Sequence, residues 1–339
     1  MSCEVYPMSR NATPSSFGWD FQINAAIVLM LENIKTIKSV RVEGKKEDIE
    51  LLLENKKNIY AQAKSVMRID DYRNIRKKLK MGLETLNDDA AHQDYHKLIY
   101  VTNSPNPFDL DNTMSAFYGH SRLSYTDLPQ VCKDIIDNEI ANKPLQYIDI
   151  SNLEIHVIPF FTDDFQQRYR VIKDSVDKFL FELNNNTRGM ADELLEIWQH
   201  EFFQNCTQGD LDLVIKKKDL MWSIIVLQSQ LHPEHTLLEE YDDGAVEEII
   251  RSYRYLINNR CEKFEFISQV LFDYRNFKSD EKGKKKVVEF IAAKCDDYKH
   301  VFELNKICDE VQEIVVKIIL QKIITNRFLA NDIAKKVNL

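Results

Sequence analysis

This 339-residue chain lacks three kinds of sequence feature, and each absence argues against one class of site or function. There is no G-x-x-x-x-G-K-[ST] loop and no G-x-G-x-x-G run, so we expect no nucleotide binding of the kind that those loops support. The six cysteines form no C-x-x-C pair, which predicts reduced thiols in a cytoplasmic protein rather than a zinc site. No signal peptide and no apolar run of membrane-spanning length is apparent, so we expect no membrane contact.

The composition is that of a globular protein with room for two domains. Hydrophobic residues make up 44% and charged residues 29% of the chain. The formal net charge of −9 argues against a protein that coats DNA indiscriminately. Any affinity for DNA therefore has to come from local basic patches.

The most informative segment runs from residue 41 to residue 66. It contains two short apolar runs, Ile49–Leu53 and Ile59–Val66, separated by the polar stretch Glu54–Asn58. This pattern predicts a β-hairpin with a five-residue loop.

Acidic, amide and basic side chains are expected to share one face of this hairpin. Side chains alternate along a strand, so Asp48 and Glu50 share a face, as do Gln62 and Lys64. The five-residue loop sets Glu50 opposite Gln62 and Asp48 opposite Lys64, on the same side of the sheet. A slip of one residue would separate them.

This set of side chains suits metal-assisted cleavage of phosphodiesters. Mg²⁺, or Mn²⁺ in its place, takes oxygen ligands, often one or two carboxylates plus a substrate phosphate. We therefore predict Asp48, Glu50 and Gln62 as metal ligands, with Lys64 completing the catalytic set by neutralising charge on the phosphate. The alternative is an ordinary solvated hairpin, which spacing alone favours because polar strand faces commonly carry Asp, Glu and Lys.

An acid followed about one hairpin later by Gln-x-Lys resembles the PD-(D/E)xK nuclease signature in its Q-x-K form. The surrounding text resembles the endonuclease domain of the CD-NTase-associated antiphage effectors. The resemblance extends over about the first 160 to 200 residues, and its strong part is Phe17–Ser65. The segments that carry it are Phe17–Gln22, Ala25–Ala26, Leu31–Ile34, Val42–Gly44, Glu47–Glu50 and Gln62–Ser65.

The resemblance implies an α/β restriction-endonuclease-like core with a mixed β-sheet, which cuts double-stranded DNA with Mg²⁺. It makes Asp48 the motif acid, Gln62 and Lys64 the Q-x-K pair, and Glu50 an additional ligand. Two further residues are candidates for a supporting role, Gln22 on the first helix and Glu43.

Elements expected after the hairpin divide the chain into two domains. Helices are predicted near 18–34 and 70–86, and strands at 98–102, 146–150 and 153–160. From about residue 163 only helices are expected, near 163–183, 190–205, 217–230, 245–278, 285–303 and 309–337. We accordingly assign residues 1–16 to a flexible lead-in, 17–185 to the nuclease domain and 186–339 to an all-α partner-docking or regulatory domain.

The helix expected near 70–86 carries a basic stripe opposite its apolar face. The stripe consists of Arg73, Arg76, Lys77 and Lys80. Beside a nuclease motif it has two interpretations of equal weight. It either binds DNA phosphates, which positions a duplex without reading its sequence, or it is a solvated helix face.

The last helix, 309–337, is apolar around much of its circumference and must be buried. It lies at the centre of the helical domain, packs against another chain, or does both, so we expect self-association or partner binding through these helices. Full-length CD-NTase-associated effectors carry an α/β cyclic-oligonucleotide sensor at this position. An all-helical tail instead resembles the nuclease subunit of Lamassu-type defence complexes, which implies docking on an SMC-like ATPase and an accessory subunit.

The sequence thus predicts a Mg²⁺-dependent endonuclease for double-stranded DNA in antiphage or anti-plasmid defence, held inactive by a partner complex until triggered. Two alternatives stay open. One is a non-catalytic helical adaptor of a multi-subunit complex, and the other is an RNA-directed nuclease of the same fold.

Overall fold

A computed structural model provides the structure, which describes residues 13–43, 48–91, 94–142, 145–162, 165–183, 189–207, 214–230, 244, 264–299 and 309–338. The chain forms two compact units. The first contains residues 1–184 and 195–215, and the second contains residues 185–194 and 216–339. Most of the lead-in, residues 1–12, and most of the helix expected at 245–278 lie outside the described residues. No described helix is long and apolar enough to cross a membrane.

The first unit is built on a mixed seven-stranded sheet, in the order β5-β6-β4-β3-β2-β1-β7. Strands β3, β4 and β6 are parallel, whereas β1, β2 and β3 pair antiparallel and β5 pairs antiparallel with β6. The strands are β1 Ile37–Val42, β2 Ile49–Leu53, β3 Asn58–Lys64, β4 Tyr95–Thr102, β5 Ser121–Ser124, β6 Leu153–Val157 and β7 Ile215–Lys216. This α/β architecture with a mixed sheet confirms the expected class at that level.

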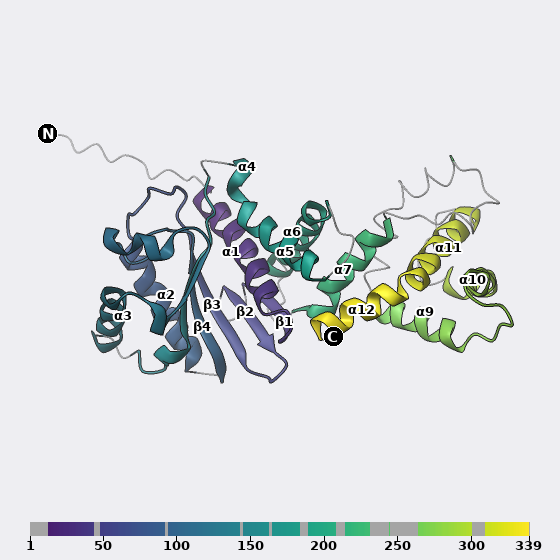
Figure 1. Ribbon diagram of the computed structural model, residues 1–339, viewed down its shortest axis with the longest axis horizontal. Helices are drawn as coiled ribbons and strands as arrows, with labels where there is room; N and C mark the ends of the chain where they lie inside the picture. The colour runs from purple at the N-terminus through teal and green to yellow at the C-terminus, as the bar shows by residue number, and fades with distance from the viewer. Residues whose placement is uncertain are drawn as a thin grey trace. The chain divides into compact units, whose positions relative to one another are not determined.

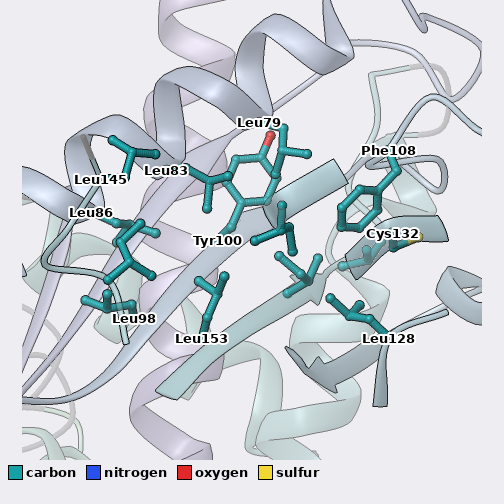
Figure 2. Close-up of a cluster of buried hydrophobic side chains, with 14 of the residues drawn as sticks. Leu79, Leu83, Leu86, Leu98, Tyr100, Phe108, Leu128, Cys132, Leu145 and Leu153 are labelled. Atoms are coloured by element: carbon teal, nitrogen blue, oxygen red, sulfur yellow. The ribbon is translucent and has the colours of Figure 1, made fainter. Parts of the chain in front are cut away.

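Helices cover both faces of the sheet (Figure 1). Helix α1, Thr13–Glu32, packs on β1, β2 and β3, and α2, Ile75–Ala90, packs on β3 and β4 from the other side. Figure 2 shows this second side, where leucines of α2 meet Tyr100 and Leu98 of β4 and Leu153 of β6. The remaining helices of this unit are α3 Gln130–Asn142, α4 Phe165–Arg168, α5 Arg170–Glu182 and, from residue 195 onward, α6 Ala191–Thr207, with short 3₁₀ turns at Asp111–Phe117, Tyr125–Asp127 and Ile150–Asn152.

Two sequence predictions in this unit were wrong in detail, and one helix was missed. No strand forms at 146–150, where the described chain makes turns and a 3₁₀ turn that starts at Ile150. Helix α3 was not expected, and α2 begins at Ile75 instead of near residue 70. The later start has a local cause, since Asn74 precedes α2 in a left-handed conformation with a φ of 60°.

The hairpin forms as expected, but with a different register. The turn has four residues, Glu54–Lys57, because Lys56 adopts a φ of 67° and the Leu53 N–H donates to the Lys57 carbonyl at 2.9 Å. Glu50 therefore lies opposite Tyr60 and not opposite Gln62. The register is displaced by two residues, so every side chain keeps its expected face.

In the second unit the described residues are helical apart from Lys216 of β7 and short connections. The two-residue strand β7 corrects the expectation of helices alone after residue 163. Its helices are α7 Lys217–Gln230, α9 Phe264–Asn276, α10 Lys284–Lys299, α11 Asp309–Thr325 and α12 Arg327–Val337. The apolar residues of α11 are buried against α9 and α10, with Ile318 and Ile319 only 5% and 0% exposed. Its own unit covers these residues, and docking of the C-terminal helices on another chain stays a prediction.

Candidate active site

The candidate site lies at the edge of the sheet where the parallel strands β3, β4 and β6 end. Because β2 runs antiparallel to β3, the start of β2 meets the end of β3 at this edge. Ile49 pairs with Ala61, and so Asp48 comes opposite Gln62. Ligands of sheets with parallel strands commonly bind outside these carboxyl ends.

Asp48 is the centre of the polar contacts at this edge. Its Oδ2 accepts hydrogen bonds from Gln62 Nε2 and from the Ala63 N–H, the latter at 2.9 Å. Lys64 Nζ lies 3.7 Å from the same oxygen. The structure thus brings three predicted site residues together, although the two-residue change of register exchanges their partners.

Glu43 and Gln22, the two predicted supporting residues, lie beside Asp48. Glu43 follows β1 with a φ of 52°, and its N–H donates to the Asp48 carbonyl at 2.8 Å. Burial raises the pKa of Glu43, and the negative charge of Asp48 raises it further. Burial also raises the pKa of Asp48, against the lowering effects of Lys64 and of hydrogen bonds from Ala63, Gln22 and Gln62.

These neighbours fit a hard divalent cation. Two residues with raised carboxyl pKa values, Asp48 and Glu43, are neighbours, and Gln22 Oε1 is buried without a hydrogen-bond partner. Within the described ranges no three His, Cys, Asp or Glu side chains are grouped so that they could hold a metal ion. This donor set matches the usual coordination of Mg²⁺, which binds one or two carboxylates and completes its coordination shell with water and substrate phosphate.

Two predicted ligands occupy different positions from those expected. Glu50 lies across from Tyr60, and its Oε2 is 3.5 Å from NH1 of Arg41 on β1. Gln62 turns its amide nitrogen toward Asp48, which orients that carboxylate. The structure therefore favours Glu43 over Glu50 as the second acid beside Asp48.

The predicted basic stripe is largely engaged within the protein. Arg73 binds Asp71, with 2.8 Å between Nε and Oδ1, and Arg76 NH1 donates to the Phe108 carbonyl at 3.3 Å. The remaining members differ in exposure and pairing, since Lys77 is exposed and Lys80 Nζ lies 3.2 Å from Glu139 Oε2. A role for these side chains in DNA binding stays a prediction.

Sequence reasoning missed residues that position the site from other elements. Lys78 of α2 donates to the Ser65 carbonyl at 2.7 Å, directly after Lys64. Asn103, buried after β4, binds the main chain of Val66. An Asn directly after a buried strand was the available signal for Asn103, whereas nothing in the sequence distinguished Lys78 from the lysines next to it.

Helix α6 also approaches this region within the first unit. Asn205 Oδ1 accepts a hydrogen bond of 3.2 Å from the Val42 N–H, next to Glu43, and Gln199 Nε2 donates to Asn24 Oδ1 of α1 at 2.8 Å. Part of the segment expected to belong to the helical domain therefore supports the strand that carries Glu43.

Comparisons with known proteins add little to this site. No protein-family model matches the sequence, and no curated protein matches it. A structure of an Acinetobacter baumannii Cap4 SAVED/CARF-domain containing receptor with the cyclic trinucleotide 3'3'3'-cAAA is similar at 12% identity and a TM-score of 0.38, over 61% of this chain and 44% of that chain.

A Moraxella osloensis Cap4 SAVED/CARF-domain containing receptor is similar at 11% identity and a TM-score of 0.36, over 60% of this chain and 46% of that chain. This chain thus spans less than half the length of these receptors. A likeness this distant carries no argument about function, which has to rest on the site itself.

Proposed function

We propose that the first unit is a metal-dependent endonuclease that hydrolyses phosphodiester bonds in double-stranded DNA. The observation that carries this proposal is the contact of one half-buried carboxylate, Asp48, with both residues of the Q-x-K pair. A solvated hairpin, the alternative, would leave such side chains apart and exposed. Here Gln62 is buried, and Lys64 and Asp48 are only 26% and 17% exposed.

Each residue has a role in this chemistry. Asp48 and Glu43 would hold Mg²⁺ or Mn²⁺ with the Gln22 oxygen beside them, and Gln62 orients Asp48. The cation supplies Lewis acidity toward the phosphoryl oxygen. Lys64 neutralises the charge that develops on the phosphate. Water provides the oxygen of the new P–O bond, and one ester oxygen leaves as a hydroxyl, so no redox partner is needed.

The resemblance of residues 17–65 to antiphage effector nucleases supports DNA as the substrate and defence as the setting. Phosphate chemistry is common to DNA and RNA, so RNA cleavage is an outcome that the substrate test includes. We extend the proposal to regulation by an SMC-like ATPase complex, as the resemblance to Lamassu effectors implies.

The test is to incubate purified full-length protein with supercoiled plasmid and, separately, with structured RNA, in Mg²⁺ and in EDTA. We expect plasmid cleavage that EDTA abolishes and that a folded Lys64→Met variant lacks. Cleavage of RNA alone would show that the substrate is RNA instead of DNA. Absence of cleavage of both substrates, with or without candidate partner proteins, would favour the non-catalytic adaptor.

A further inference from the structure

Helix α2 comes unusually close to the sheet at Tyr100 of β4, beside the candidate site, and a glycine makes this approach possible. A Cβ atom on Gly82 would lie 2.6 Å from the ring of Tyr100 and 3.7 Å from Cγ of Gln62. Figure 2 shows the Tyr100 ring beside Leu79 and Leu83 of α2. Any larger residue at position 82 would meet the Tyr100 ring and push α2 away from β4 and from its neighbour β3, which carries Gln62 and Lys64.

Lys78 lies one helical turn before Gly82 and shares its face, because residues four apart in a helix are neighbours. Its side chain is therefore directed at the end of β3. Lys78 Nζ donates a hydrogen bond of 2.7 Å to the carbonyl of Ser65. Lys64 precedes Ser65, so two lysines from different elements meet at one edge of the sheet.

The positive charge of Lys78 has a neutral acceptor in the described structure, the Ser65 carbonyl. Asp71, the acid whose charge acts on Lys78, binds Arg73 with both oxygens, at 2.8 and 3.0 Å. Burial lowers the pKa of Lys78, the charge of Asp71 opposes this, and the charges of Arg73 and Lys64 lower it further. A nearby anion would stabilise the charged form of Lys78 against burial and against these positive charges.

We propose that Lys78 is a second phosphate-binding lysine of the active site, which binds a non-bridging oxygen of the nucleic-acid backbone next to the phosphate that Lys64 contacts. This inference rests on the proposed nuclease function. An ammonium group has three donors, so Lys78 can keep its bond to Ser65 while it binds phosphate. Asp48 lies within ion-pair distance of Lys64, which leaves the charge of Lys78 for the substrate.

The position of Lys78 separates this role from general electrostatic attraction. Lys77, its neighbour, is exposed, whereas Lys78 is partly buried and fixed by Ser65. A fixed ammonium in the site should stabilise the phosphate in the transition state as well as in the bound substrate. A solvated lysine would contribute to binding alone.

The experiment measures duplex DNA binding against salt concentration in the cleavage-deficient Asp48→Asn background. Lys78→Gln should weaken binding and reduce the slope of log K against log salt by about 0.9, the amount for one phosphate contact. Lys78→Arg should restore the slope, since it keeps the charge. Lys38→Gln is the matched control, because Lys38 is exposed on β1, and it should change neither quantity.

A second readout uses the cleaving enzyme. Lys78→Gln should lower kcat/KM at least about tenfold with loss in kcat, as expected for an interaction made in the transition state. The difference from wild type should shrink as pH rises, because a lysine with a lowered pKa loses its proton earlier. Circular dichroism checks the fold, and a comparison of Lys78→Met with Lys78→Arg replaces Lys78→Gln if that variant unfolds.

An unchanged salt slope and unchanged kcat/KM in a folded Lys78→Gln protein would overturn the role of Lys78 and leave the nuclease function standing. A wild-type protein that neither binds nor cuts nucleic acid would overturn the nuclease function, and the role of Lys78 with it. The two failures are therefore distinguishable.

Discussion

The side chain of Asn103 binds both main-chain polar groups of Val66. Its Nδ2 donates to the Val66 carbonyl at 2.6 Å, and its Oδ1 accepts from the Val66 N–H at 2.7 Å. The same Nδ2 donates to the Phe160 carbonyl. Asn103 is fully buried and follows β4, so it joins the ends of β3, β4 and β6 at the edge that carries Lys64.

We expect Asn103→Ala to destabilise the first unit by about 3 kcal/mol, because it leaves buried main-chain groups without partners. The midpoint of urea unfolding, followed by circular dichroism, measures this loss. Asn152→Ala, which removes an exposed bond to Asp149, is the control and should change stability by about 0.5 kcal/mol or less. Equal effects of the two substitutions would contradict the role assigned to Asn103.

Gly82→Ala should lower stability and cleavage together. The added Cβ meets the Tyr100 ring at 2.6 Å, and overpacking of this kind costs about 1–3 kcal/mol, against a gain in helix propensity of about 1 kcal/mol. Gly18→Ala, in α1, is the control, since its Cβ would meet Ser65 Oγ at an ordinary 3.9 Å. Thermal unfolding and plasmid cleavage are measured for both, and a neutral Gly82→Ala would refute the close approach.

The response to Mg²⁺ should depend on pH with a definite sign. Asp48 and Glu43 have raised pKa values, so ionising them lowers the stability of the cation-free protein as pH rises through those values. A bound cation offsets this loss and adds about 2.7 kcal/mol at a hundred times its Kd. The rise in Tm with Mg²⁺ should therefore be largest at neutral pH and fade as pH falls.

Asp48→Asn provides the control for this measurement. It removes a half-buried charge, so it should raise the Tm of the cation-free protein at neutral pH and abolish the response to Mg²⁺. A Tm shift with Mg²⁺ that is the same in both proteins, or that does not vary with pH, would show that the cation binds elsewhere.

A fragment of residues 1–215 should be more stable than a fragment of residues 1–184. The longer fragment keeps the part of α6 that belongs to the first unit, including Trp198, which is fully buried and packs against Phe179 with ring centroids 6.3 Å apart. We expect residues 1–215 to unfold cooperatively and residues 1–184 to be less stable and prone to aggregation. Equal stability of the two fragments would contradict the assignment of α6 to this unit.

Periodicity predicted the faces of the hairpin but not its register. Alternation placed Asp48, Gln62 and Lys64 on one face, and this survives because the displacement is by two residues. The register itself depends on a four-residue turn with Lys56 in the left-handed region. Lysine is not a residue that signals that conformation, so the loop length was overestimated.

The remaining site residues depend on contacts between distant parts of the chain. Glu43 reaches Asp48 through the end of β1, and Lys78 reaches the site because Gly82 lets α2 pack closely on β4, next to β3. Likewise, the apolar circumference of α11 predicted burial, but only packing could show that α9 and α10 cover it. A single sequence predicts the helices and strands, but it does not show which of them pack against each other.

The most direct measurement is single-turnover cleavage of supercoiled plasmid in Mg²⁺ by wild type, Asp48→Asn and Glu50→Gln. The site described here predicts that Asp48→Asn loses about a hundredfold or more in rate. Glu50→Gln should stay within about tenfold of wild type, as a substitution outside the cation site. Wild-type cleavage by a folded Asp48→Asn protein would contradict the assignment of this edge of the sheet as a nuclease active site.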